Sequence, residues 1–304
     1  MREVYYLCKR NVLVFMRDYA AVFFSVLSML ITLLLMVVFL GKMNTDNVLW
    51  ILSEYGGERD VLQDEKNAQY LIQMWTLAGI IAVNTVTVSL TVMQTMVRDE
   101  GNGHLASFYV APVKRFKIVL GYILASWLIG SGISFLTLLI GEGYMVAQGY
   151  EVHGLTTIIK MLVMILLNAF VYSAVGYLLA LFIHSESAWG GMLTIVGTLV
   201  GFLGAIYLPL SMLSESIVKL LKCLPVLHGT AMMRKILTED AMAVTFEGLP
   251  EVVPEMFARE IGITLWNGET QITLASQILV LILYAIIAIA VATIISKRRK
   301  IHDR

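Results

Sequence analysis

Residues 272–295 read ITLASQILVLILYAIIAIAVATII, an apolar run without a charged residue, and a basic cluster from Lys297 to Lys300 follows directly. An α-helix needs roughly 20 residues to cross about 30 Å of hydrocarbon, so this run is long enough to span a membrane. The sequence therefore predicts an all-α polytopic membrane protein with six transmembrane helices. The other five apolar runs lie at about residues 20–40, 68–97, 118–140, 155–183 and 188–210.

The composition agrees with this class. Of 304 residues, 58% are hydrophobic and 14% are charged, whereas soluble domains carry about 25% charged residues. The net charge is zero, and a nucleic-acid partner is not expected. The two cysteines, Cys8 and Cys223, fall on opposite sides of the predicted membrane and cannot pair within one chain.

The distribution of Lys and Arg predicts the orientation. Basic residues concentrate before the first span, in the loop 98–117 and in the tail, whereas the loop 141–154 has none. Because cytoplasmic loops carry an excess of Lys and Arg, both termini and the loop 98–117 are expected in the cytoplasm. An even number of spans also requires the termini to share a side.

Residues 1–18 are too polar to span but have a helical pattern. Apolar residues recur at helical spacing among basic ones, which predicts an amphipathic interfacial helix in contact with membrane lipids. A solvated basic anchor for the first span is the alternative. The apolar residues are Val4, Leu7, Cys8, Val12 and Phe15.

Residues 211–271 are predicted to lie outside the cell. The first half contains two short helical stretches, too short to span, with a break at Pro225 and a turn around His228 and Gly229. Such a pair suits a re-entrant helical hairpin in the outer leaflet. The second half, including the acidic segment 239–269, is predicted to be a cap loop, and its role does not follow from the pattern.

Polar side chains lie within two of the spans. Asn84, Thr87 and Thr91 fall on one helical face of the second span, and Asn168 lies in the fourth. Polar groups at membrane depth are costly facing lipid. They are expected either to hydrogen-bond between helices or to line a translocation path, and both interpretations remain open.

The fifth span is rich in glycine. Gly197 and Gly201 form a GxxxG motif, which lets helix backbones approach closely. The motif is weak by itself, but it favours a helix seam within the chain or with a second subunit.

The sequence lacks catalytic motifs. No phosphate-binding loop of the GxxxxGK[S/T] type is present, so the chain is not expected to bind ATP in that way or to be an enzyme. The five histidines are scattered over both sides of the predicted membrane, so no metal site is expected. A proton-coupled transporter usually needs a buried ionisable group, and Glu142, at the outer end of the third span, is the only candidate.

The loop 98–117 has a distinct pattern. Polar and glycine residues come first, a short helix is predicted from about His104 to Val110, and Pro112 ends it. A short cytoplasmic helix between two spans is suited to dock into a soluble motor subunit, and an ordinary basic loop is the alternative.

The order of these features resembles that of the membrane subunits (permeases) of ABC-2 type ABC transporters. In that family an acidic, glycine-containing stretch leads through a short coupling helix to a Pro-Val pair and a basic residue. His104 departs from the pattern, since the family often has a threonine or a second acid there. The matching residues are Glu100, Gly101, Gly103, Leu105, Pro112, Val113 and Lys114, together with the pairs Leu208–Pro209 and Leu224–Pro225.

The resemblance implies a half-transporter. Two six-span permease subunits, identical or homologous, would form a pathway along their seam, and two separate cytoplasmic ATPase subunits would bind ATP and Mg, so that no cofactor is held by this chain. The residues then expected to couple this chain to the ATPase are Glu100, Gly101, His104, Leu105, Phe108 and Pro112.

The expected cargo is amphipathic: a drug, an antimicrobial peptide or a lipid-linked molecule moved out of the cell. Export of a polysaccharide or glycolipid is the alternative within the family. A proton-coupled secondary transporter and a non-transporting scaffold or sensor are the alternatives from other classes.

Overall fold

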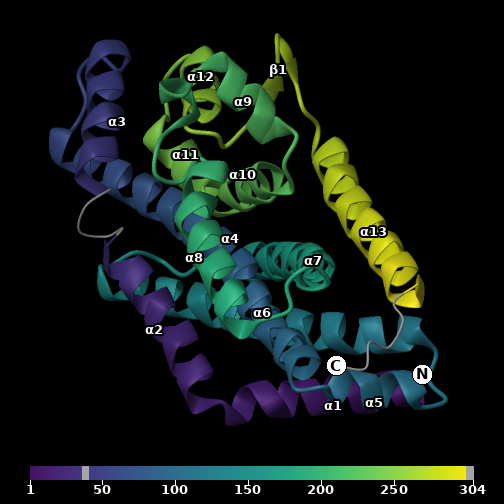
Figure 1. Ribbon diagram of the computed structural model, residues 1–304. Helices are drawn as coiled ribbons and strands as arrows, with labels where there is room; N and C mark the ends of the chain where they lie inside the picture. Colours follow the sequence, from purple (N-terminus) through teal and green to yellow (C-terminus); the bar gives the residue numbers. More distant parts are fainter. Residues whose placement is uncertain (36–40, 299–304) are drawn as a thin grey trace.

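The computed structural model describes residues 1–35 and 41–298 (Figure 1). Almost all of this part is helical, and one short antiparallel hairpin pairs β1 (Trp266–Asn267) with β2 (Thr270–Gln271). The helices are α1 (Arg2–Arg17), α2 (Tyr19–Leu35), α3 (Gly41–Tyr55), α4 (Val61–Gly101), α5 (His104–Val110), α6 (Arg115–Ala147), α7 (Leu155–Ala180), α8 (Glu186–Leu203), α9 (Glu215–Lys222), α10 (Pro225–Leu237), α11 (Glu239–Thr245), α12 (Val252–Glu260) and α13 (Leu274–Arg298).

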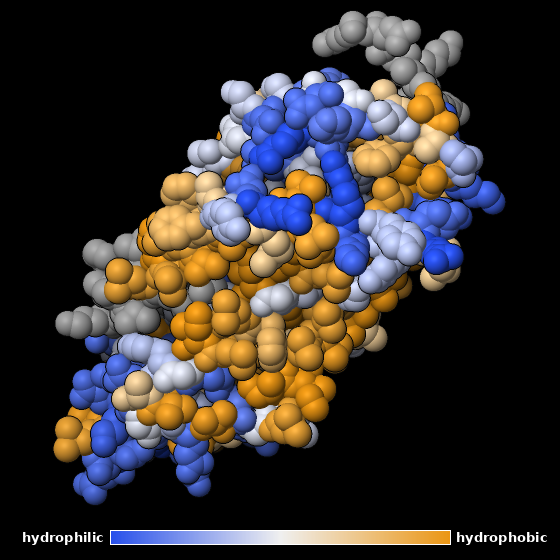
Figure 2. Space-filling view, turned by 90° about the horizontal axis from the view of Figure 1, so that it is seen from below, coloured by the Kyte–Doolittle hydropathy of each residue, from blue (hydrophilic) through white to orange (hydrophobic). Residues whose placement is uncertain are grey.

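The described residues contain five helices that are long and apolar enough to cross a membrane, namely α4, α6, α7, α8 and α13. Helix α2 adds 17 mostly apolar residues, and the predicted end of its span, residues 36–40, lies outside the described residues. The space-filling view shows a broad hydrophobic band between two hydrophilic zones (Figure 2). The predicted class, an all-α polytopic membrane protein, is confirmed.

Helix α4 is the central element of the bundle, with α6, α7, α8 and α10 packed around it. Close packing on α4 depends on small residues of its neighbours. A Cβ on Gly130 of α6 would lie 2.5 Å from the hydroxyl of Ser89, and one on Gly176 of α7 would lie 2.8 Å from Leu90. Ser126 of α6 also donates a 2.8 Å hydrogen bond to the Ser89 carbonyl. These contacts hold α4, α6 and α7 together as one core.

The molecule has two polar ends (Figure 1). One end carries α1, α5 and the start of α6, and is called the α5 end below. Arg115 donates a 2.7 Å hydrogen bond to the Ser296 carbonyl, which places the last turn of α13 at this end too. The opposite end carries α3, α9 to α12 and the hairpin, and is called the cap. The start of α1 and the end of α13 therefore lie on the same side of the hydrophobic band.

The cap has an apolar core, which the sequence did not predict. The acidic segment 239–269 was expected to be a loop, but it forms α11, α12 and the hairpin. Phe246 and Phe257 of this segment pack with Leu52 of α3 and Trp75 of α4. The expectation was wrong because the segment's own buried residues are few and are separated by acids, so they form no clear apolar pattern. The rest of the apolar core comes from α3 and the outer end of α4.

The fifth span ends at Leu203 rather than at residue 210. Gly204 and Ala205 reverse the chain, and Ala205 has a φ of 51°, in the left-handed region that only small residues adopt readily. The Ile206 amide then donates a 2.7 Å hydrogen bond back to the Gly201 carbonyl. The apolar pattern continued through this reversal, so hydropathy alone could not place the end of the helix.

The predicted re-entrant hairpin corresponds to α9 and α10, which meet at 88°. The predicted turn around His228 and Gly229 was wrong, because α10 begins at Pro225 and runs through both residues. Proline is favourable in the first turn of a helix, where its missing N–H has no intrahelical acceptor. In the same way, the loop predicted at 98–117 begins later, because α4 remains helical to Gly101.

Candidate functional site

Helix α5 lies at the end of a sharp reversal. Gly103, with a φ of 74°, precedes α5 and permits the turn from α4. Leu105 is buried in the core and the partly buried Phe108 packs against it, so both of these predicted coupling residues lie on the side of α5 that faces the bundle. The outward face carries His104, Ser107 and Val110 instead. Ser107 and Val110 were not predicted from the sequence. Helical periodicity places them away from the face that carries Leu105 and Phe108, and could have identified them.

A buried carboxylate holds this region together. Asp99, only 3% exposed, is in the last turn of α4 and pairs with both terminal nitrogens of Arg10 from α1. The Tyr122 hydroxyl of α6 donates a 2.6 Å hydrogen bond to it, and His104 Nδ1 lies 3.3 Å from its Oδ1. Burial alone would raise the pKa of Asp99, but the hydrogen bonds from Arg10 and Tyr122 outweigh it and the pKa lies below its usual value. Asp99 thus joins α1, α4, α5 and α6.

The residues beside Asp99 make separate contacts. Arg98 pairs with Asp18 at 3.0 Å and with Glu186, at the start of α8, at 3.2 Å. Glu100 lies 2.9 Å from Nδ1 of His184 in the turn between α7 and α8. The three consecutive charged residues therefore contact α1, α5, α6, the residue that joins α1 to α2, the turn between α7 and α8, and the start of α8.

The four predicted coupling residues other than Leu105 and Phe108 divide into two groups. Glu100 and Gly101 lie against the turn between α7 and α8, and a Cβ on Gly101 would sit 3.8 Å from the carbonyl oxygen of His184. His104 and Pro112 are exposed at either end of α5. Asp99, whose side chain contacts α1, α5 and α6, was not predicted, because its burial depends on α1 folding back onto α4 and α6.

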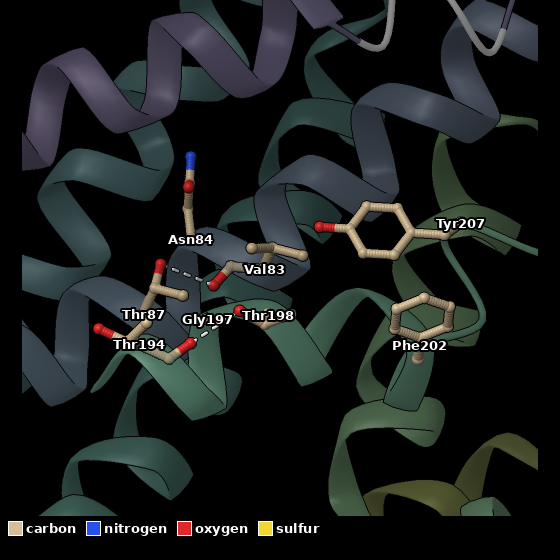
Figure 3. A pocket seen from close by; sticks show the side chains of 8 residues that line it. All are labelled: Val83, Asn84, Thr87, Thr194, Gly197, Thr198, Phe202 and Tyr207. Carbon is tan, nitrogen blue, oxygen red and sulfur yellow. Dashed lines mark hydrogen bonds between the residues drawn. The ribbon is translucent and has the colours of Figure 1, made fainter. Parts of the chain in front are cut away.

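A pocket of about 490 Å³ opens between α4 and α8 (Figure 3). Its wall is uncharged and mixed in polarity, with hydroxyl and amide groups beside two aromatic rings and a valine. In Figure 3 the hydroxyl of Tyr207 points toward Val83 of α4. The lining residues are Val83, Asn84 and Thr87 of α4, Thr194, Gly197, Thr198 and Phe202 of α8, and Tyr207 of the turn that follows.

The pocket brings together two of the four residues predicted for a path. Asn84 and Thr87 line it, and Asn84 also donates a 2.9 Å hydrogen bond to Thr137 of α6. The hydrogen bond between helices, one of the two interpretations left open for Asn84, is therefore present, and the residue also borders the pocket. Thr87 donates to the Val83 carbonyl of its own helix at 3.0 Å, which leaves its oxygen lone pairs free to accept from a ligand.

The other two predicted path residues lie elsewhere. Thr91 borders a small space beside Phe15 of α1, one turn nearer the α5 end. Asn168 is buried between α7 and α10, where its amide donates to the Met164 carbonyl at 2.9 Å. A Cβ on Gly229 of α10 would lie 1.9 Å from its Oδ1. The grouping was wrong because Thr91 faces the corner between α1 and α2, and Asn168 faces a helix that hydropathy could not position.

The glycine pair of α8 does not form one continuous seam within the chain. The Tyr207 ring covers Gly201, where a Cβ would lie 2.2 Å from its Cε2. Nothing lies within 4 Å of the Cβ position of Gly197, which borders the pocket. The close approach at Gly201 is therefore made by the turn after α8, not by a neighbouring helix.

Glu142, the candidate for proton coupling, lies at the cap end in a buried ion pair. Its carboxylate is 2.8 Å from Nδ1 of His153, and Nε2 of this ring is 3.2 Å from the Leu237 carbonyl. Burial lowers the pKa of His153, but the contacts with Glu142 and Leu237 outweigh it and the pKa lies above its usual value. With acceptors at both ring nitrogens, the imidazolium form fits the site best. In the described residues, no group of three or more potential ligands is arranged to hold a metal ion.

A multi-pass bundle with an uncharged pocket beside α8, and a short helix between two spans, is an arrangement suited to a membrane component of a transport system. The chain belongs to the ABC-2 family, because the sequence model described as "ABC-2 family transporter protein" matches residues 60–295. No curated protein matches it. The predicted resemblance is thereby confirmed: the chain is a membrane permease component of an ABC transporter, a class that associates with ABC ATPases and is not itself catalytic.

Proposed function

We propose that this chain is the membrane half of an ATP-driven exporter in the bacterial cell membrane, with its α5 end in the cytoplasm. The basic residues that flank the hydrophobic band at the α5 end support this orientation, as the positive-inside rule requires. Two permease subunits, identical or homologous, would assemble with two ATPase subunits, and the ATPases would bind ATP and Mg. Both termini would then be cytoplasmic.

The observation that carries this proposal is a polar pocket beside a poorly covered helix. Only 17% of the most apolar stretch of α8 is buried, against 89% for α4. A spanning helix with so little cover, bordering a polar space, is suited to face a second subunit across a shared path. Asn84, Thr87 and Thr194 would line the half of that path supplied by this chain.

The exposed face of α5 would receive movement from the ATPase. His104, Ser107 and Val110 would make the docking contacts, while Leu105 and Phe108 anchor the helix to the bundle. Asp99 would then pass a displacement of α5 to α1, α4 and α6, because its contacts reach all of them. Glu100 would pass it to the start of α8 through the His184 turn.

The pocket lining supports an amphipathic cargo. Hydroxyl and amide groups offer hydrogen bonds to an uncharged polar group, and the rings of Phe202 and Tyr207, 5.1 Å apart, offer an apolar surface. A drug, a peptide or a lipid-linked molecule fits this description. A glycolipid fits it as well, and transport assays with each class would separate them.

The test is reconstitution of the chain with its ATPase in lipid nanodiscs. We expect Val110→Glu to abolish stimulation of ATP hydrolysis by the permease, because it places a charge in the docking face. Leu62→Glu, in the first turn of α4 at the opposite end of the molecule, is a matched control, since both residues are 73% exposed hydrophobics. Full stimulation with the Val110 variant would remove α5 from the docking interface, and the absence of any ATPase complex would refute the exporter.

A further inference from the structure

Arg234 of α10 is fully buried, and no carboxylate of the described residues neutralises it. Burying a guanidinium without a counter-ion is costly, so its remaining contacts must compensate. Its planar group stacks over the Trp75 ring, 4.1 Å from the ring centroid. Its two terminal nitrogens donate to different carbonyls, those of Ala205 at 2.8 Å and Ile261 at 3.2 Å.

These contacts join four separate parts of the chain. Trp75 belongs to the outer half of α4, and Ile261 follows α12 in the cap. The Trp75 indole also donates to the Ile261 carbonyl at 2.8 Å, so the cap is fastened to α4 at the same point. Ala205 lies in the turn after α8. Arg234, itself in α10 of the cap, is therefore the group through which α4 and the segment after α12 hold that turn.

The turn at Ala205 needs such a contact. Ala205 is the one non-glycine residue with a positive φ in the described part of the chain, and this conformation disfavours a side chain. The Ala205 carbonyl is buried, so without Arg234 it would lose its hydrogen-bond donor. The guanidinium thus offsets both the backbone strain and the burial of a carbonyl.

The same turn sets one wall of the pocket. Two residues after Ala205, the Tyr207 ring lies on Gly201 and against the Phe202 ring, with ring centroids 5.1 Å apart and planes at 80°. Both aromatic residues line the pocket (Figure 3). If the turn relaxed, Tyr207 would leave Gly201 and the aromatic wall would separate.

We propose that Arg234 is a positioning residue, which holds the Ala205 turn and thereby the aromatic wall of the pocket, and links this wall to the cap. The importance of this wall for transport rests on the proposed function, but the positioning itself does not. A movement of the cap would reach Tyr207 through one guanidinium, because Ile261 and Ala205 are bound to the same side chain. Lysine could not replace it, since a single ammonium lacks the planar fork that reaches two carbonyls while stacking on a ring.

The test places one fluorotyrosine at position 207, by site-specific incorporation, in the full chain in nanodiscs. Wild type is expected to show one narrow ¹⁹F resonance. Arg234→Met is expected to add a second resonance from a displaced ring. The ratio of native to displaced ring should fall about tenfold, because one hydrogen bond from a charged group is lost. Arg234→Lys should also show the second resonance.

Arg259→Met is the matched control. Arg259 also stacks on a tryptophan, 5.3 Å from the centroid of Trp266, and donates to a carbonyl, that of Gly268 at 3.0 Å. Its contacts lie within the cap and do not reach the Ala205 turn, so its spectrum should match wild type. An unchanged spectrum for folded Arg234→Met would overturn the proposal. So would failure of both Arg234 variants to fold, since the residue would then serve global stability.

The ¹⁹F measurement needs neither cargo nor ATPase, so it separates this inference from the proposed function. A second resonance in Arg234→Met, with cargo transport insensitive to Thr87→Val and Thr194→Val, would support the positioning role and refute the pocket as a path. Where the path is correct, Arg234→Met should raise the cargo KM about tenfold and leave the maximal rate of ATP hydrolysis unchanged, because the docking face is distant. Rescue by lysine would contradict the requirement for the planar fork.

Discussion

The contact between Asp99 and Arg10 makes the strongest prediction about α1. Asp99→Asn removes the charge but keeps one oxygen, which can still accept from Tyr122 and from one nitrogen of Arg10, so the ion pair and the second hydrogen bond from Arg10 are lost. Hydrogen bonds to a charged group contribute about 1.5–3 kcal/mol, and water can reach the side chain of Arg10, which is 33% exposed. The substitution should therefore lower the free energy needed to detach α1 by about 2 kcal/mol, near the lower part of this range. That change raises the population of the detached state roughly 30-fold.

Hydrogen exchange of the α1 amides in nanodiscs measures this population. Protection of residues 2–17 should fall about 30-fold in Asp99→Asn. Asp64→Asn, which breaks a comparable arginine pair with Arg59 in the cap, should leave α1 unchanged. In a double-mutant cycle with Arg10→Gln, a coupling energy below about 0.5 kcal/mol would refute the reasoning, because the two side chains would then act independently.

Three further predictions concern packing, pH and coupling. Gly121→Ala places a Cβ 2.6 Å from the Cβ of Leu7 and should destabilise the docking of α1 by about 1–3 kcal/mol; Gly132→Ala, with open space, is the control in the same exchange measurement. Because the pKa of His153 is raised on folding, its stabilising contact is fully present below the ordinary histidine pKa and is lost as pH rises through the folded value. Thermal melts should therefore lose stability on the alkaline side, and His153→Gln should flatten that slope. Glu100→Lys should fold but hydrolyse ATP without transport, and normal transport would exclude Glu100 from coupling.

The short-range features of the candidate site could be predicted from the sequence. Helix α5 has the predicted limits because a glycine precedes it and a proline follows it. Asn84 and Thr87 share the pocket because residues three apart lie on one helical face. Each of these depends on neighbours along the chain, and helical geometry determines their relation before any tertiary contact forms.

Other parts of the site could not be predicted. Asp99 was missed because its partners Arg10 and Tyr122 are distant in sequence, and nothing local distinguishes a buried acid at a helix end from an exposed one. Leu105 was assigned to docking, although its burial shows that it anchors α5. In both cases the direction of a side chain depended on which helix packs against it.

The sequence by itself determined the membrane class, the number and order of apolar segments and the family. The class and the order of the segments follow from the cost of placing polar groups in hydrocarbon, which each segment meets individually. The family follows from the order of the motifs around the loop 98–117 and from the family model that matches residues 60–295. The tertiary structure alone decided where α8 ends, that the acidic segment 239–269 folds onto α4, and that Arg234 joins the cap to the pocket wall. Those outcomes depend on backbone strain and side-chain burial that involve several distant segments at once. Their free energy therefore cannot be worked out from any single stretch of the sequence.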